Sequence, residues 1–206
     1  MKYPTLNEEK KLWKRGYKVV ACIDEVGRGP LAGPVVACAV CVDPQILNTK
    51  YKIQKLRDSK QLSAKQREYW YNIFSFHPTV QWGIGSVSPQ VIDQINIYQA
   101  TKLAMKRALM NLHHKIDFVM LDGNMSIDVP IPQESIIKGD EKVFSCAIAS
   151  IIAKVRRDRM MVKYHRKYPH FRFDKHKGYG TRLHFQELQE HGPCKIHRKS
   201  FAPCNL

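Results

Sequence analysis

Apolar residues recur along this chain in two spacings, which indicate alternating strands and helices. Short apolar runs bounded by glycine, proline or aspartate are typical of buried strands, and longer runs with a spacing of three to four are typical of amphipathic helices. Ser63 and the Ser88-Pro89 pair stand where two helices should begin, because serine caps helix N-termini and proline fits a first turn. The predicted strands are 19–24, 34–42, 79–87 and 116–122, with a short extended piece at 134–140; the predicted helices are 64–74, 88–112, 145–168 and 181–191.

The order of these elements predicts an α/β fold with a mixed β-sheet, because strands come first and then alternate with helices. The 206 residues suit one ordinary domain, and a hydrophobic share of 44% is sufficient for a buried core. No internal repeat, low-complexity tract or long linker divides the chain. We therefore expect a single domain over residues 1–206.

The charge of the chain is strongly positive and unevenly distributed. The formal net charge is +16, and residues 154–199 contain 14 Lys or Arg against 4 Asp or Glu. A surplus of this size favours a polyanionic partner, and nucleic acid is the first candidate. A membrane surface is disfavoured because the aromatic residues do not form one apolar stripe beside the basic ones. A merely basic, ribosome-like protein remains the alternative on charge alone.

The first residues contain no apolar segment of the kind found in secretion signals, and no run approaches the length of a membrane span. We therefore expect a cytoplasmic protein whose six cysteines are free thiols in a reducing compartment. Cys38 and Cys41 form a C-x-x-C pair inside a predicted strand. Positions three apart on a strand point to opposite faces, so this pair is not expected to share a metal ion.

Four acidic residues follow predicted strands or strand-like pieces. Asp24 and Asp122 each end an apolar strand just before a glycine-containing turn, Glu25 adjoins Asp24, and Asp140 ends the extended piece. Ligands of open α/β sheets bind at this edge. Carboxylates that converge there need neutralising cations, and Mg²⁺ or Mn²⁺ suits an all-oxygen set. Inside a basic protein, this arrangement indicates two-metal phosphoryl transfer, although any one acid alone could be a strand-end cap.

Gly27, Arg28 and Gly29 follow the first two acids directly. Glycines allow the backbone to approach a ligand closely, and an arginine between them can bind a phosphate. Because a G-x-G segment is common in ordinary turns, it supports a phosphate ligand only in combination with the acids.

The motifs "DEVGRGPLAGPVV", "LRDSKQLS", "LDGN", "KGDEKV", "ASIIAKVRRD" and "HKGYGT" occur here in this order. In these motifs and their spacing the chain resembles bacterial ribonuclease HII, the type 2 ribonuclease H family, from about residue 18 to residue 203. The resemblance implies a ribonuclease H-like α/β core at about 18–168 and a basic, helical C-terminal extension at about 169–206. One departure is the sequence 146–150, which reads CAIAS where the family often reads SAAS or AAAS.

The resemblance also implies a role for each site residue. The metal-binding and catalytic acids would be Asp24, Glu25, Asp122 and Asp140, holding two Mg²⁺ or Mn²⁺ ions. The backbone of the Gly-Arg-Gly segment would recognise the 2′-hydroxyl that distinguishes RNA from DNA, and an aromatic ring would pack on the sugar beside the cleaved phosphate. The residues expected to bind substrate are Gly27, Arg28, Gly29, Ser59, Lys60 and Tyr179.

The resemblance implies an endonuclease that hydrolyses the RNA strand of RNA–DNA hybrids. It would also nick duplex DNA 5′ of embedded ribonucleotides, leaving 3′-hydroxyl and 5′-phosphate ends. The expected protein is a monomer, and whether a replication clamp docks on its tail stays open. Two alternatives stay open: a ribonuclease HIII-like enzyme, which requires a longer stretch of RNA, and a basic hybrid-binding protein without catalysis.

Two further sets of residues in the basic region are given structural roles. Asp158 lies among arginines on a predicted helix and is expected to be an ion-pair partner rather than a fifth metal ligand. The tail histidines lack the close spacing of a zinc site, so we interpret them as part of the basic face. They are His165, His170, His176, His184, His191 and His197.

Overall fold

A five-stranded mixed sheet forms the centre of the computed structural model, which describes residues 3–48, 56 and 59–204. The strand order is β3-β2-β1-β4-β5. β1 pairs antiparallel with β2 and parallel with β4, β2 pairs antiparallel with β3, and β4 pairs parallel with β5. The predicted α/β class with a mixed sheet is confirmed. The strands are β1 (Val20–Val26), β2 (Val35–Val42), β3 (Val80–Val87), β4 (Phe118–Asp122) and β5 (Gln133–Ile136).

The helices begin largely where the sequence predicts. Ser63 accepts a hydrogen bond from the Gln66 amide and receives one back in a capping box, and Ser88 caps the helix that starts at Pro89. The described elements are α1 (Asn7–Lys14), η1 (Pro44–Asn48), η3 (Ser59–Gln61), α2 (Ala64–Ser75), α3 (Pro89–Met110), α4 (Gly139–Lys142), α5 (Phe144–Lys167), α6 (Phe173–His176) and α7 (Arg182–His191).

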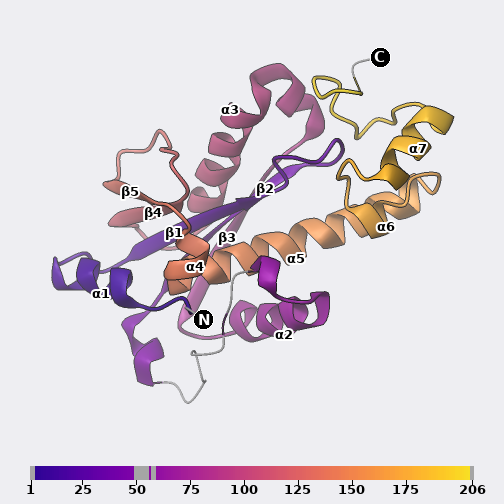
Figure 1. Cartoon of the computed structure of the whole chain (residues 1–206). Coiled ribbons are helices and arrows are strands. Elements are labelled where there is room, and N and C mark those ends of the chain that lie inside the picture. Colours follow the sequence, from indigo (N-terminus) through magenta and orange to yellow (C-terminus); the bar gives the residue numbers. More distant parts are fainter. Residues whose placement is uncertain (1–2, 49–55, 57–58, 205–206) are drawn as a thin grey trace.

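The sheet is covered by α3 on one face and by α5 with α2 on the other (Figure 1). Strand β2 shows why both faces are buried. Val35, Ala37, Ala39 and Cys41 pack in the cluster that contains α3, whereas Cys38, Val40 and Val42 pack in the cluster that contains α5. Because side chains alternate along a strand, a strand between two helical layers must be apolar throughout, as this one is.

Three local features differ from the prediction. Helix α1 forms in the charged N-terminal segment, where the buried carboxylate of Glu9 accepts hydrogen bonds from the Ser145 amide and hydroxyl at 2.9 and 2.8 Å. Helix α3 is interrupted at Asn96, whose φ of 63° and ψ of 166° lie in a region that residues other than glycine rarely adopt. Asp140 lies in α4 rather than at a strand end, because Lys138 takes a left-handed conformation and starts a short helix.

The cysteines are not all free. The structure joins Cys22 of β1 to Cys146 of α5, whose Cα atoms lie 5.2 Å apart, so the expectation of six free thiols is wrong for this pair. A separation of 124 residues hid the contact in the sequence. Cys38 and Cys41 are buried in different clusters on opposite faces of the sheet, as predicted.

Among the described residues, no helix combines the length and the apolar character that crossing a membrane would need.

Candidate active site

Three of the predicted acids meet at the carboxyl ends of two neighbouring parallel strands. Asp24 lies near the end of β1 and Asp122 ends β4, and the strands pair with Ile23 beside Leu121. Asp140 reaches the same point from α4. Carboxylate oxygens of the three lie within 4.8 Å of one another. The parallel pairing therefore creates a compact all-oxygen cluster from residues up to 116 positions apart in the chain.

Backbone amides hold two of these carboxylates in place. The Glu25 amide donates to Asp24 Oδ1 at 2.7 Å, and the Gly139 amide donates to Asp122 Oδ1 at 2.6 Å. A Cβ atom at Gly139 would lie 3.3 Å from that same Asp122 oxygen and 3.1 Å from the sulfur of Cys146. Glycine thus allows α4 to pack close behind the end of β4, which brings Asp140 into the cluster.

Burial and mutual repulsion raise the pKa of two of the acids. Asp24 is 5% exposed, and desolvation followed by repulsion from Glu25 and Asp122 raises its pKa well above the usual range. Desolvation and the charge of Asp140 raise the pKa of Asp122 in the same direction. The ammonium of Lys60 lies 3.2 Å from Asp140 and supplies positive charge beside the cluster. Such a cluster favours additional cations.

Glu25 lies at the edge of the cluster rather than in it. Its carboxylate is 3.3 Å from the Arg28 guanidinium, and its side chain is 14% exposed. Burial raises the pKa of Glu25, and the neighbouring Arg28 charge opposes that shift. Glu25 nevertheless lines the same cleft as Asp24.

Asp24 and Glu25 line a narrow cleft of about 100 Å³ beside the cluster. Ser59 is buried there, and its hydroxyl lies 2.8 Å from the Ser150 hydroxyl, while Arg67 donates to its carbonyl oxygen at 2.9 Å. The Lys60 side chain is 80% exposed and can reach a ligand. The lining residues are Asp24, Glu25, Val26, Ser59, Lys60, Arg67, Ser150, Lys154 and Tyr179.

Two buried arginines hold the 27–34 loop, and sequence reasoning missed both. Arg198 donates to the carbonyl oxygens of Gly27, Arg28 and Gly33 at 2.5 to 3.1 Å. Arg157 donates at 3.0 to 3.2 Å to three other carbonyl oxygens, those of Ala32, Pro34 and Lys177.

Neither guanidinium has any exposed surface. Their hydrogen bonds to carbonyl oxygens supply the solvation that burial removes. Desolvation still lowers the pKa of both, to about 9 for Arg198, which leaves Arg198 charged at neutral pH.

The position of Gly27 explains why the loop needs glycine there. Its φ is +93°, and a Cβ atom would lie 2.2 Å from Arg157 Nε. A side chain would therefore strain the backbone and displace the guanidinium. The only sequence signals for Arg157 and Arg198 were their places among many other basic residues, which do not distinguish a buried arginine from a surface one.

Tyr179 stands on the turn between α6 and α7, at the edge of the cleft, and is 40% exposed. The Lys154 ammonium and the Arg157 guanidinium lie 5.8 and 5.7 Å from its ring centre. These cations surround a partly open aromatic face, which suits a ligand with both a ring and a negative charge.

Asp158 forms an ion pair at 2.9 Å, as predicted, although its partner is Lys154 rather than a neighbouring arginine. The interpretation of the tail histidines as a basic face is wrong for His176, His184 and His197, which are buried. Their spacing of eight and thirteen residues carries no pattern from which this cluster could have been predicted.

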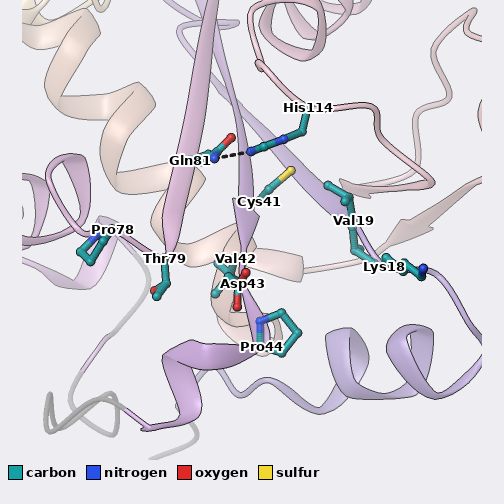
Figure 2. A pocket seen from close by; sticks show the side chains of 11 residues that line it. Lys18, Val19, Cys41, Val42, Asp43, Pro44, Pro78, Thr79, Gln81 and His114 are labelled. Carbon is teal, nitrogen blue, oxygen red and sulfur yellow. Dashed lines mark hydrogen bonds between the residues drawn. The ribbon is translucent and has the colours of Figure 1, made fainter.

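A larger hollow of about 180 Å³ lies at the opposite end of the central strands (Figure 2). It is lined by the start of β1, the end of β2 and the start of β3, and Gln81 Nε2 lies 2.5 Å from His114 Nε2 at its side. None of the residues predicted to act in catalysis or binding lines it. The smaller acidic cleft is therefore the candidate active site on chemical grounds.

Comparison with known proteins identifies relatives that share one description. A family model described as Ribonuclease HII matches residues 21–204. A ribonuclease HII of Bacillus thuringiensis (strain Al Hakam) is 51% identical over 195 residues, covering 95% of this chain and 73% of the relative. A ribonuclease HII of Bacillus pumilus (strain SAFR-032) is 50% identical over 189 residues, covering 92% and 72%.

Solved structures share the fold at lower identity. Ribonuclease H2 from Pyrococcus horikoshii OT3 has a TM-score of 0.74 at 24% identity, with 91% of this chain and 95% of that chain covered. The PCNA:RNase HII complex from Archaeoglobus fulgidus has a TM-score of 0.69 at 23% identity, covering 89% and 95%. Bst-RNase HIII in complex with Mn²⁺ has a TM-score of 0.69 at 19% identity, covering 91% and 68%. The sheet and its helices therefore have the ribonuclease H-like fold.

Proposed function

Because the chain belongs to the ribonuclease HII family of metal-dependent hydrolases, we propose that it cleaves nucleic acid at the cluster of Asp24, Asp122 and Asp140. Membership of the family implies ribonuclease H endonuclease activity on RNA–DNA hybrids. The finer proposal is that it also nicks duplex DNA 5′ of a single embedded ribonucleotide, the reaction that starts ribonucleotide excision repair. The observation that carries it is the meeting of three carboxylates, the buried Asp24 and Asp140 and the half-buried Asp122, beside the Gly27–Gly29 loop.

The donor set fits Mg²⁺ or Mn²⁺. The three clustered acids offer only oxygen atoms within 4.8 Å of one another, and hard divalent ions prefer such ligands. Asp24, Asp122 and Asp140 would hold the ions, with Glu25 completing the set from the cleft edge. When bound, two such ions lower the pKa of the attacking water and stabilise the leaving oxygen. A solved relative of the same fold, Bst-RNase HIII, is described with Mn²⁺.

The residues around the acids bind and orient the substrate. Arg157 and Arg198 draw the carbonyl groups of the 27–34 loop inward, so the loop presents a fixed backbone edge to a 2′-hydroxyl. Arg28 and Lys60 contribute positive charge for backbone phosphates, and Tyr179 packs on the sugar next to the cut. Ser59 is proposed as a further phosphate contact; its hydroxyl lies 2.8 Å from the Ser150 hydroxyl in the wall of the cleft.

The basic region 154–199 supplies the electrostatic attraction for the rest of the duplex. A replication-clamp contact is also proposed, since one structural neighbour is described as a complex with PCNA. Cytoplasmic location and a monomeric state remain predictions.

A substitution panel tests the assignment of the acids. Asp24→Asn, Glu25→Gln, Asp122→Asn and Asp140→Asn should each remove most cleavage of an RNA–DNA hybrid in Mg²⁺ without unfolding the protein, and EDTA should abolish cleavage by the wild type. Asp128→Asn is the matched control, because that carboxylate is fully exposed. A variant that keeps wild-type turnover would remove its residue from the site. Cleavage that persists in EDTA would contradict the metal-dependent mechanism.

A further inference from the structure

Three buried histidines lie beneath the turn that carries Tyr179. The exposed fractions of His176, His184 and His197 are 7%, 0% and 3%. We propose that these histidines are positioning residues, which hold the 176–179 turn through hydrogen bonds of fixed direction and so set the place of the Tyr179 ring at the cleft. This proposal rests on the proposed role of Tyr179 in binding the sugar.

The direction of the first hydrogen-bond chain follows from its starting point. The Cys194 amide lies 2.9 Å from His197 Nδ1, and an amide can only donate, so Nδ1 accepts. A neutral ring then carries its proton on Nε2, which lies 2.9 Å from His184 Nε2 and donates to it. His184 must therefore carry its own proton on Nδ1, which donates to the Tyr179 carbonyl oxygen at 3.0 Å.

A second chain holds the same turn from the adjacent residue. The Gly178 amide donates to His176 Nδ1 at 3.1 Å, so the His176 proton lies on Nε2 and is donated to Glu187 at 3.0 Å. Arg172 donates to the same carboxylate from its side chain at 3.0 Å and from its backbone amide at 3.2 Å. The rings of His176 and His184 stack, with centroids 4.1 Å apart and an interplanar angle of 16°. The two chains therefore support each other.

Each chain requires a neutral ring. A second proton on His197 would remove the acceptor for the Cys194 amide, and one on His184 would oppose two N–H groups across 2.9 Å. Burial, together with the neighbouring histidine, lowers the pKa of both His184 and His197 to about 4. Both nitrogens of all three rings are engaged in hydrogen bonds, which leaves no lone pair for a metal ion.

The turn itself needs this support. Lys177 and Gly178 both adopt left-handed backbone conformations, with φ of 51° and 84°, and such a conformation is unfavourable for lysine. The Leu31 amide donates to the Gly178 carbonyl oxygen at 2.8 Å, and Arg157 donates to the Lys177 carbonyl oxygen at 3.0 Å. The histidine chains thus fix one side of a turn whose other side is tied to Leu31 and, through Arg157, to Ala32 and Pro34.

A double-substitution experiment measures whether His184 acts through Tyr179. His184→Phe keeps a ring but loses both hydrogen bonds, and His184→Asn keeps a donor near the Nδ1 position. On a duplex with one ribonucleotide, His184→Phe should lower kcat/KM by roughly five- to 150-fold, the loss expected for Tyr179→Ala from the energy of one stacked ring. His184→Asn should recover part of this loss. Adding Tyr179→Ala to His184→Phe should cost nothing further, and His113→Phe, at an exposed position outside the basic region, should match the wild type.

The proposal would be overturned if the double variant lost kcat/KM by the product of the two single-variant factors. A fully active His184→Phe protein would overturn it as well. Nitrogen-15 NMR of the wild-type protein measures the histidine tautomers directly. This test does not depend on whether the variants fold or on any activity assay. At neutral pH we expect His184 as the Nδ1–H tautomer and His176 and His197 as Nε2–H tautomers. A protonated His184, or one with its proton on Nε2, would overturn the chain of hydrogen bonds. If these tautomers are found but Tyr179→Ala is fully active, the hydrogen-bond chain is supported and the proposed role of Tyr179 in binding the sugar is refuted.

Discussion

Replacing Asp24 by asparagine should stabilise the metal-free protein while removing its activity. The substitution removes one charge from a cluster whose oxygens lie within 4.8 Å of one another. Two unit charges at that distance repel by about 3 kcal/mol at an effective dielectric constant of 20. The raised pKa of Asp24 already relieves part of this repulsion by protonation, so we expect a gain of about 1 to 3 kcal/mol in the free energy of unfolding. The asparagine oxygen can still accept the Glu25 amide.

Thermal unfolding in EDTA measures this effect. For a chain of this length, the gain corresponds to a rise in Tm of roughly 3 to 10 °C. Added Mg²⁺ should raise the Tm of the wild type and raise that of Asp24→Asn much less, because the variant has lost a ligand. Asp128→Asn, whose carboxylate is fully exposed, should leave the Tm in EDTA unchanged. A lower Tm for Asp24→Asn in EDTA would mean that Asp24 stabilises the strand end, and the argument from repulsion would be refuted.

Three further predictions concern binding, recognition and acid stability. The affinity for an RNA–DNA hybrid should fall steeply as the salt concentration rises. Lys163→Ala removes an exposed basic residue beside α2 and should reduce the slope of log affinity against log salt concentration by about one. Binding that does not depend on salt would contradict this. Tyr179→Ala should lose far more kcat/KM on a single-ribonucleotide duplex than on a long hybrid, whereas Tyr179→Phe should keep most activity; equal losses on both substrates would exclude junction sensing. Because the folded pKa values of His184 and His197 lie near 4, below the usual 6.5, the unfolded chain binds more protons. The free energy of unfolding should therefore drop by about 2 kcal/mol per histidine between pH 7 and pH 5, and urea titrations should show a smaller drop in His184→Phe.

Hydrophobic periodicity was sufficient to predict most of the sheet, because the buried strands are apolar and end at recognisable turns. The acids could be placed at the carboxyl ends of β1 and β4 because parallel strands end at the same edge of a sheet. Helix caps at Ser63 and Ser88 were predictable from local chemistry alone. These are features in which neighbouring residues determine the conformation.

The features that could not be predicted depend on contacts between distant residues. Arg157 and Arg198 resemble every other basic residue of the C-terminal region until the fold brings the carbonyl groups of the 27–34 loop around them. The three buried histidines resemble a basic surface until α6, α7 and the segment after α7 enclose them. Asp140 was expected after a strand, but one left-handed residue, Lys138, started a helix there.

Cleavage of a DNA duplex that contains one ribonucleotide tests the central claim most directly. The account predicts a single nick on the 5′ side of the ribonucleotide in Mg²⁺, leaving a 3′-hydroxyl and a 5′-phosphate. It also predicts no nick in EDTA, in an all-DNA duplex or with the Asp122→Asn variant. A protein that binds this duplex but leaves it intact in both Mg²⁺ and Mn²⁺, while it cleaves a long RNA–DNA hybrid, would contradict recognition of the single ribonucleotide. Binding without cleavage of either substrate would contradict the assignment of Asp24, Asp122 and Asp140 as a catalytic cluster.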